Sequence, residues 1–86
     1  LPFPSPARRS TTFSLTLAEE GVARVEAFDA AGRRVRTLLS GTRPAGTTPV
    51  TWDLADDGGA RLPAGLYLVR GEALGAIGTR RVLILP

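Results

Sequence analysis

The sequence predicts an all-β chain folded as an antiparallel sandwich of six to seven short strands. Three observations support this prediction. Several short segments alternate apolar and polar residues with a period of two. Turn-forming residues recur about every 8–12 residues, and no segment sustains a helical period. The 86 residues are enough for one domain with one core.

The N-terminal residues 1–10 are predicted to form a proline-rich arm or linker, and residues 11–86 the sandwich domain. Pro2, Pro4 and Pro6 alternate with other residues, and each proline fixes its own φ and favours extended geometry in the residue before it. We therefore expect either a linker from an upstream domain or a lead-in strand along a sheet edge.

The first hairpin of the domain is predicted from residues 22–39. Before it, residues 11–17 alternate apolar and hydroxyl side chains, as a half-buried strand does, and a turn follows at residues 18–21. A strand over 22–28 is joined to a strand over 33–39 by a tight turn, in which Asp29 and Gly32 supply the turn chemistry. The outward arginines of the second strand are placed to pair with Glu26.

The second half of the chain begins with a predicted polar loop over residues 40–49. A short strand over 50–52 carries the only tryptophan, and the most polar loop follows it at 53–60. The remaining predicted elements are a strand over 66–72, a turn of small residues over 73–78 and a last strand over 79–85. The residues assigned to the core are Phe13, Val25, Val35, Trp52, Tyr67, Val69, Val82 and Ile84, and those assigned to turns are Asp29, Gly32, Asp53 and Gly65.

The composition argues against an enzyme. The chain has no histidine, no cysteine and no lysine, which removes the commonest general base, the thiol nucleophile and Schiff-base chemistry. We predict no catalytic residue and no cofactor. The 11 basic residues are all arginines interleaved with eight acidic residues, so the sequence favours a solvated surface over a nucleic-acid site. No apolar run reaches the length of a membrane span.

The acidic segment Asp53, Asp56 and Asp57 is the one alternative metal site, because calcium prefers several oxygen ligands from a flexible loop. The spacing does not fit an EF-hand, since Ala55 stands at the third position and no glutamate follows at the twelfth. A polar loop is the preferred interpretation, and the prediction is no metal site. Asp56 and Asp57 also do not form a catalytic pair, because adjacent side chains point apart.

The order of these motifs resembles a known family. Thr11-Thr12-Phe13-Ser14-Leu15, Phe28-Asp29 to Gly32, Trp52-Asp53 and Gly65-Leu66-Tyr67 together resemble the immunoglobulin-like domain of the bacterial flagellar hook-capping protein, and the related C-terminal sorting domains of type IX secretion cargo. The resemblance covers roughly Pro4 to Leu85. It implies an immunoglobulin-like, fibronectin III-like β-sandwich. The chain departs from the sorting-domain pattern at its end, because it has no lysine-rich final strand.

The resemblance implies a non-catalytic accessory module of a secreted bacterial protein, used for sorting, anchoring or assembly, and located outside the cell or at its surface. The expected partner is a protein: the secretion machinery, another domain of the parent protein or copies of this chain, with a homo-oligomer as one outcome. One alternative is a self-assembling subunit of a filament or surface layer, and another is a carbohydrate-binding module. Sheet edges are open to strand addition, so the residues assigned to assembly are Pro2, Phe3, Pro4, Pro6, Leu83 and Leu85.

Overall fold

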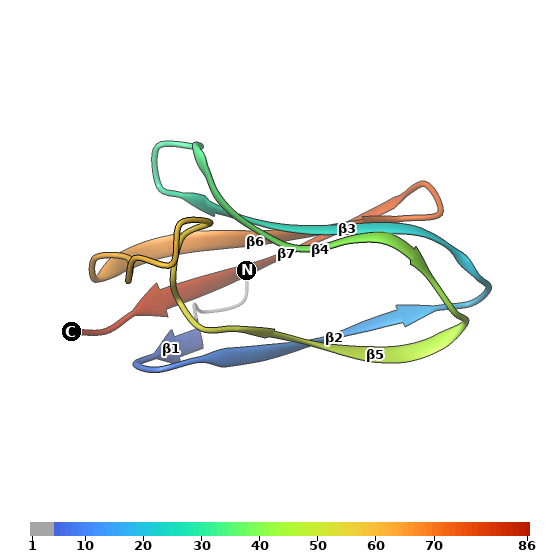
Figure 1. The fold of residues 1–86 in the computed structure, drawn as a ribbon, viewed down its shortest axis with the longest axis horizontal. Helices are drawn as coiled ribbons and strands as arrows, with labels where there is room; N and C mark the ends of the chain where they lie inside the picture. The colour runs from blue at the N-terminus through green and yellow to red at the C-terminus, as the bar shows by residue number, and fades with distance from the viewer. Residues whose placement is uncertain (1–4) are drawn as a thin grey trace.

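Two β-sheets make up the computed structural model, which describes residues 5–86. The larger sheet has five strands in the order β1-β7-β6-β3-β4, and the smaller sheet pairs β2 with β5. The strands are β1 (Ser5–Ala7), β2 (Thr11–Leu17), β3 (Gly21–Asp29), β4 (Arg34–Arg43), β5 (Gly46–Trp52), β6 (Gly65–Ala73) and β7 (Ala76–Ile84). Figure 1 shows the sheets as two layers, with β2 and β5 beneath β3, β4, β6 and β7. The prediction of an all-β sandwich is confirmed.

The core lies between the layers, because the period of two in each strand directs alternate side chains toward the opposite sheet. Strand β3 buries Ala23, Val25 and Ala27 and turns the residues between them outward. Six of the residues assigned to the core are buried: Val25, Trp52, Tyr67, Val69, Val82 and Ile84. Phe13 and Val35 are half-buried and pack against this cluster. The described residues contain no helix long and apolar enough to cross a membrane.

Strands β1 and β7 are parallel, and among residues 5–86 they are the one pair that departs from the antiparallel arrangement. Ser5 pairs with Val82 and Ala7 with Ile84. The chain then turns through residues 8–10 and enters the other sheet as β2. Part of the predicted arm is therefore an edge strand of the larger sheet, whereas its residues 1–4 lie outside the described residues.

Two segments that we predicted as loops are mostly strand. In the first, residues 40–49, β4 continues to Arg43 and β5 begins at Gly46, so only two residues connect them. In the second, residues 73–78, the connection between β6 and β7 is also two residues, Leu74 and Gly75, both with positive φ (51° and 77°). Serine, glycine and alanine have little preference for strands, but the hydrogen-bonded ladder to the neighbouring strand extends through them.

Candidate interaction surfaces

The acidic loop, residues 53–61, uses its carboxylates to hold backbone. The Asp56 Oδ1 atom accepts hydrogen bonds from the amides of Gly58 and Ala60, both at 2.9 Å. The Asp57 Oδ1 atom accepts from the Thr37 amide at 2.9 Å, and the Asp57 amide donates to the Val35 carbonyl at 3.0 Å. These bonds attach the loop to the outer edge of β4.

Asp53 completes this arrangement. Its Oδ1 atom accepts from the Ala55 amide at 3.1 Å and from Arg36 Nη1 at 3.0 Å. An oxygen atom of each of the three aspartates is therefore engaged by a donor within the fold. Among residues 5–86, no group of three acidic side chains is arranged to hold a metal ion. The carboxylates of this loop therefore order its backbone and attach it to β4.

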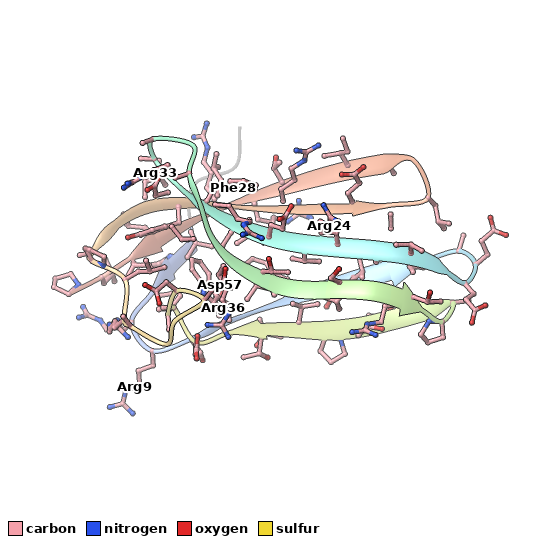
Figure 2. The ribbon with its side chains drawn as sticks, turned by 45° about the horizontal axis from the view of Figure 1, so that its top comes forward. Arg9, Arg24, Phe28, Arg33, Arg36 and Asp57 are labelled. Carbon is pink, nitrogen blue, oxygen red and sulfur yellow. The ribbon has the colours of Figure 1, made fainter. Side chains whose placement is uncertain are left out.

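Arg36 is the residue in this region whose role the sequence did not reveal. Its Nη1 atom donates to Asp53 Oδ1 at 3.0 Å and to the carbonyls of Ala55 and Asp56 at 3.1 and 3.2 Å. Figure 2 shows Arg36 and Asp57 at the junction of the loop and β4. The sequence offers only an arginine on a predicted strand and an aspartate 17 residues later that opens the acidic loop. The prediction that the arginines of this strand point outward is therefore wrong for Arg36, which is half-buried.

The loop also encloses the centre of the core. Trp52 is fully buried, and its Nε1 atom donates to the Ala55 carbonyl at 3.0 Å. That carbonyl thus accepts from both Trp52 and Arg36. Leu54, which lies between Trp52 and Ala55 in the chain, is fully buried although its φ is 62°, a left-handed conformation that is costly for a residue other than glycine. The buried leucine side chain and the two donors hold this conformation in place.

The β3–β4 turn is organised by Asp29. Its Oδ1 atom accepts from the amides of Ala31 and Arg33, both at 3.0 Å, and its Oδ2 atom pairs with the Arg33 guanidinium at 3.0 Å. The hydrogen bond from the Arg33 amide is the largest cause that holds the pKa of Asp29 below its ordinary value. Gly32 has φ of 84° and Gly65 has φ of 151°, a region that favours glycine.

The two largest aromatic residues face each other in the core. The rings of Trp52 and Tyr67 meet edge to face, with centroids 5.9 Å apart and planes at 77°. The Tyr67 hydroxyl donates to the Pro63 carbonyl at 2.8 Å, and burial raises the pKa of this phenol, with a smaller contribution from the charge of Asp29. These two residues therefore give no exposed aromatic platform.

The outer face of the larger sheet has two different halves. In one half, charged residues oppose each other across β3 and β6: Arg24 pairs with Glu72, and Glu26 with Arg70. In the other half the register brings together an apolar group that we call the leucine patch: Phe28, Leu66, Leu68 and Leu83. Leu66 and Leu68 are 40% and 38% exposed, whereas Phe28 and Leu83 are half-buried.

The leucine patch includes one of the residues assigned to assembly, Leu83. Pro6 is exposed and pairs with Leu83 in the β1–β7 ladder, so it extends the same face. Leu85 is half-buried beyond the end of β7. Pro2, Phe3 and Pro4 lie outside the described residues. The sequence did not reveal the patch, because its members come from three strands and only the register brings them together.

A groove of about 580 Å³ opens along one side of the sandwich, and we call it the side groove. One wall is the whole of β2, including the half-buried Phe13 and Leu15. The other wall is formed by the ends of β6 and β7 that adjoin their hairpin. That wall consists largely of small residues, Gly71, Ala73, Ala76 and Gly78, together with Ile77 and Arg80.

The comparisons with known proteins agree with this geometry. A model of the family described as FlgD Ig-like domain matches residues 6–76. The chain belongs to the FlgD Ig-like domain family. The resemblance to the immunoglobulin-like domain of the hook-capping protein, inferred from the spacing of its motifs, is thereby confirmed.

Among solved structures, the domain is similar to part of dimeric latent PorU from Porphyromonas gingivalis, with a TM-score of 0.75 and 25% sequence identity. The match covers 96% of this chain but only 9% of the PorU chain, so this FlgD Ig-like domain corresponds to a small part of that protein. None of the curated proteins matches this chain.

Proposed function

We propose that this FlgD Ig-like domain is a non-catalytic module of a larger secreted or surface-exposed bacterial protein, and that it docks onto another protein during sorting, anchoring or assembly. The observation that carries the proposal is the leucine patch. Exposed apolar groups that lie together on one face are typical of protein contact sites, and here Leu66 and Leu68 lie side by side with Phe28 and Leu83 on a rigid sheet.

The surroundings of the patch support a protein partner. Arg34 and Arg81 pair in the ladder with Phe28 and Leu68, so cationic side chains lie beside the leucines. An apolar centre with arginine near it has the composition of a protein interface, in which arginine is enriched. The small share of PorU that the domain matches also supports an accessory role within a larger chain. The absence of histidine, cysteine and lysine leaves little with which to build a catalytic centre.

A reporter fusion tests this function. The reporter carries a secretion signal at its N-terminus and this domain at its C-terminus, in a bacterium that exports proteins with such modules. We expect the reporter to reach the surface or the medium with the intact domain, and to remain inside with Leu66→Glu/Leu68→Glu. The matched control is Val22→Glu, because Val22 is 70% exposed but lies outside the leucine patch.

Equal export with and without the domain would contradict the proposal. Equal export of the double variant and the control would show that the leucine patch is not the docking face. Sedimentation of the isolated domain separates the self-assembling alternative, which predicts oligomers, from docking onto a different protein, which predicts a monomer.

A further inference from the structure

The leucine patch is crossed by a row of four side chains with an arginine at each end. The register of β7, β6, β3 and β4 sets these residues side by side, in the order Arg81, Leu68, Phe28 and Arg34. The row lies on the outer face of the larger sheet. Its centre is apolar and its two ends are cationic.

Alternation along the strands keeps both arginines on this face. Val82 is fully buried, so Arg81 next to it on β7 points outward. Arg34 stands opposite Phe28 and is exposed. Neighbouring strands lie about 4.8 Å apart, so three intervals separate the two arginines by about 14 Å. This distance is close to the diameter of one α-helix with its side chains, about 10–12 Å.

The positive charge at the ends of the row is incompletely neutralised within the fold. Among residues 5–86, Arg81 forms no ion pair. Arg34 has one long contact, at 3.8 Å to Glu26 Oε2, and the side chain of that glutamate is only 18% exposed. Glu26 also lies opposite Arg70 in the register of β3 and β6. The rim of the leucine patch therefore presents positive charge to whatever contacts it.

We propose, as an inference that rests on the docking function above, that the leucine patch contacts an acidic surface of a different protein, whose carboxylates meet Arg34 and Arg81. A guanidinium group matches a carboxylate in geometry as well as in charge. Opposite charges around an apolar contact guide encounter and exclude wrong partners. The separation of the arginines predicts carboxylates on both sides of an apolar contact about one helix wide.

A second copy of this chain fits the leucine patch poorly. A two-fold axis through the patch would bring the rim of one copy close to the rim of the other. Arg34 and Arg81 would then approach the same arginines of the second copy, and like charges across an interface are unfavourable. Glu26 does not remove this conflict, because it already contacts Arg34. The charge of the rim therefore favours an acidic partner over self-association.

Charge reversal in the reporter fusion described above tests this inference. We expect Arg34→Glu/Arg81→Glu to reduce export of the reporter by about tenfold or more, because carboxylates would then face carboxylates. The matched control is Arg9→Glu/Arg80→Glu, which changes the net charge equally and should stay within about twofold of the intact domain. Arg80 pairs with buried Val69, so it faces away from the leucine patch, and Figure 2 shows Arg9 pointing away from the domain.

Two further variants separate charge from folding. Arg34→Lys/Arg81→Lys keeps both positive charges and should export within about threefold of the intact domain. Arg34→Gln/Arg81→Gln removes the charges without placing a carboxylate near Glu26, and it should still reduce export by about threefold or more. The purified glutamine variant should melt within about 4 °C of the intact domain, since both side chains lie at the surface.

The outcomes distinguish this inference from the docking function on which it rests. Export that is lost with Leu66→Glu/Leu68→Glu but normal with both charge-removing variants would leave the docking function standing and overturn the acidic partner. Normal export with the leucine variant as well would overturn both proposals. Equal losses with the lysine and glutamate pairs would also overturn the acidic partner, because the positive charge would then not be what is recognised.

A lipid surface is the other acidic surface that an apolar patch with arginines could meet. The purified domain is therefore mixed with vesicles of equal parts phosphatidylglycerol and phosphatidylcholine and separated by flotation. We expect the domain to remain with the soluble fraction. Flotation with the vesicles that Arg34→Glu/Arg81→Glu abolishes would assign the two arginines to lipid headgroups and overturn the proposal.

Discussion

The Ala55 carbonyl allows a quantitative test of how the acidic loop is held. It accepts from Trp52 Nε1 at 3.0 Å and from Arg36 Nη1 at 3.1 Å, and Ala55 is only 7% exposed. Trp52→Phe removes the first donor and Arg36→Met the second. Each single variant leaves the carbonyl with one partner, whereas the double variant leaves it buried with none.

The expected magnitudes follow from this difference. A hydrogen bond contributes about 0.5–1.5 kcal/mol to the free energy of unfolding, but an orphaned buried group costs about 1–3 kcal/mol. The double variant should therefore lose about 1–2 kcal/mol more than the sum of the single variants. The smaller volume of phenylalanine and the lost Arg36–Asp53 ion pair affect the single and double variants alike, so they cancel in the cycle.

Urea unfolding followed by circular dichroism measures this coupling, since Trp52→Phe removes the only tryptophan. The control cycle combines Trp52→Phe with Arg24→Met on the outer face of the larger sheet, and it should be additive within about 0.5 kcal/mol. Additivity in the Trp52 and Arg36 cycle as well would refute the shared role of the Ala55 carbonyl.

Three further predictions concern single residues. Leu54→Gly should destabilise less than Leu54→Ala, by about 1 kcal/mol, because glycine relieves the cost of φ at 62°; urea midpoints in the opposite order would contradict this. Tyr67→Phe should cost about 0.5–1.5 kcal/mol through loss of the bond to Pro63. Because the pKa of Tyr67 is raised in the folded state, the stability that its neutral hydroxyl contributes is complete below about pH 10 and is lost as pH rises through the folded-state pKa. The melting temperatures of the parent chain and of Tyr67→Phe should therefore converge in alkali, and a constant difference between them would exclude this linkage. Because the pKa of Asp29 is lowered in the folded state, its carboxylate stabilises the fold above pH 3.8, the ordinary value, and this stabilisation is lost as pH falls through the folded-state pKa. Asp29→Ala should therefore melt at a lower temperature than the parent chain at pH 7 and approach it in acid. An equal difference in melting temperature at both pH values would contradict this prediction.

Much of the fold could be predicted from local pattern. The alternation around Val25 and the turn chemistry of Asp29 and Gly32 place the β3–β4 hairpin, because both act between residues close in sequence. The pattern was weakest where small and hydroxyl residues continue a strand, as at residues 40–43 and 73–78. There the ladder to a neighbouring strand determines the structure, and a ladder joins residues that are distant in sequence.

The candidate surfaces were harder to predict for the same reason. Leu66 and Leu68 alternate as one strand, but the patch exists only because the register sets Phe28 and Leu83 beside them. The side groove lies between β2 of one sheet and the β6–β7 hairpin of the other, and no local pattern records how these two segments are placed relative to each other. The sequence pattern of Arg36 is that of a surface charge, because its three acceptors, on Asp53, Ala55 and Asp56, lie in a loop that is distant from it in sequence.

Site-specific photo-crosslinking tests the central claim most directly, namely that the leucine patch docks onto a protein partner. A photoreactive side chain at position 68, in the complete parent protein on living cells, lies in the patch, and the same group at position 22 lies outside it. We predict that position 68 crosslinks to one defined protein, that position 22 does not, and that Leu66→Glu abolishes the crosslink. Equal crosslinking from both positions, or none from position 68 in cells that export the protein normally, would contradict the claim.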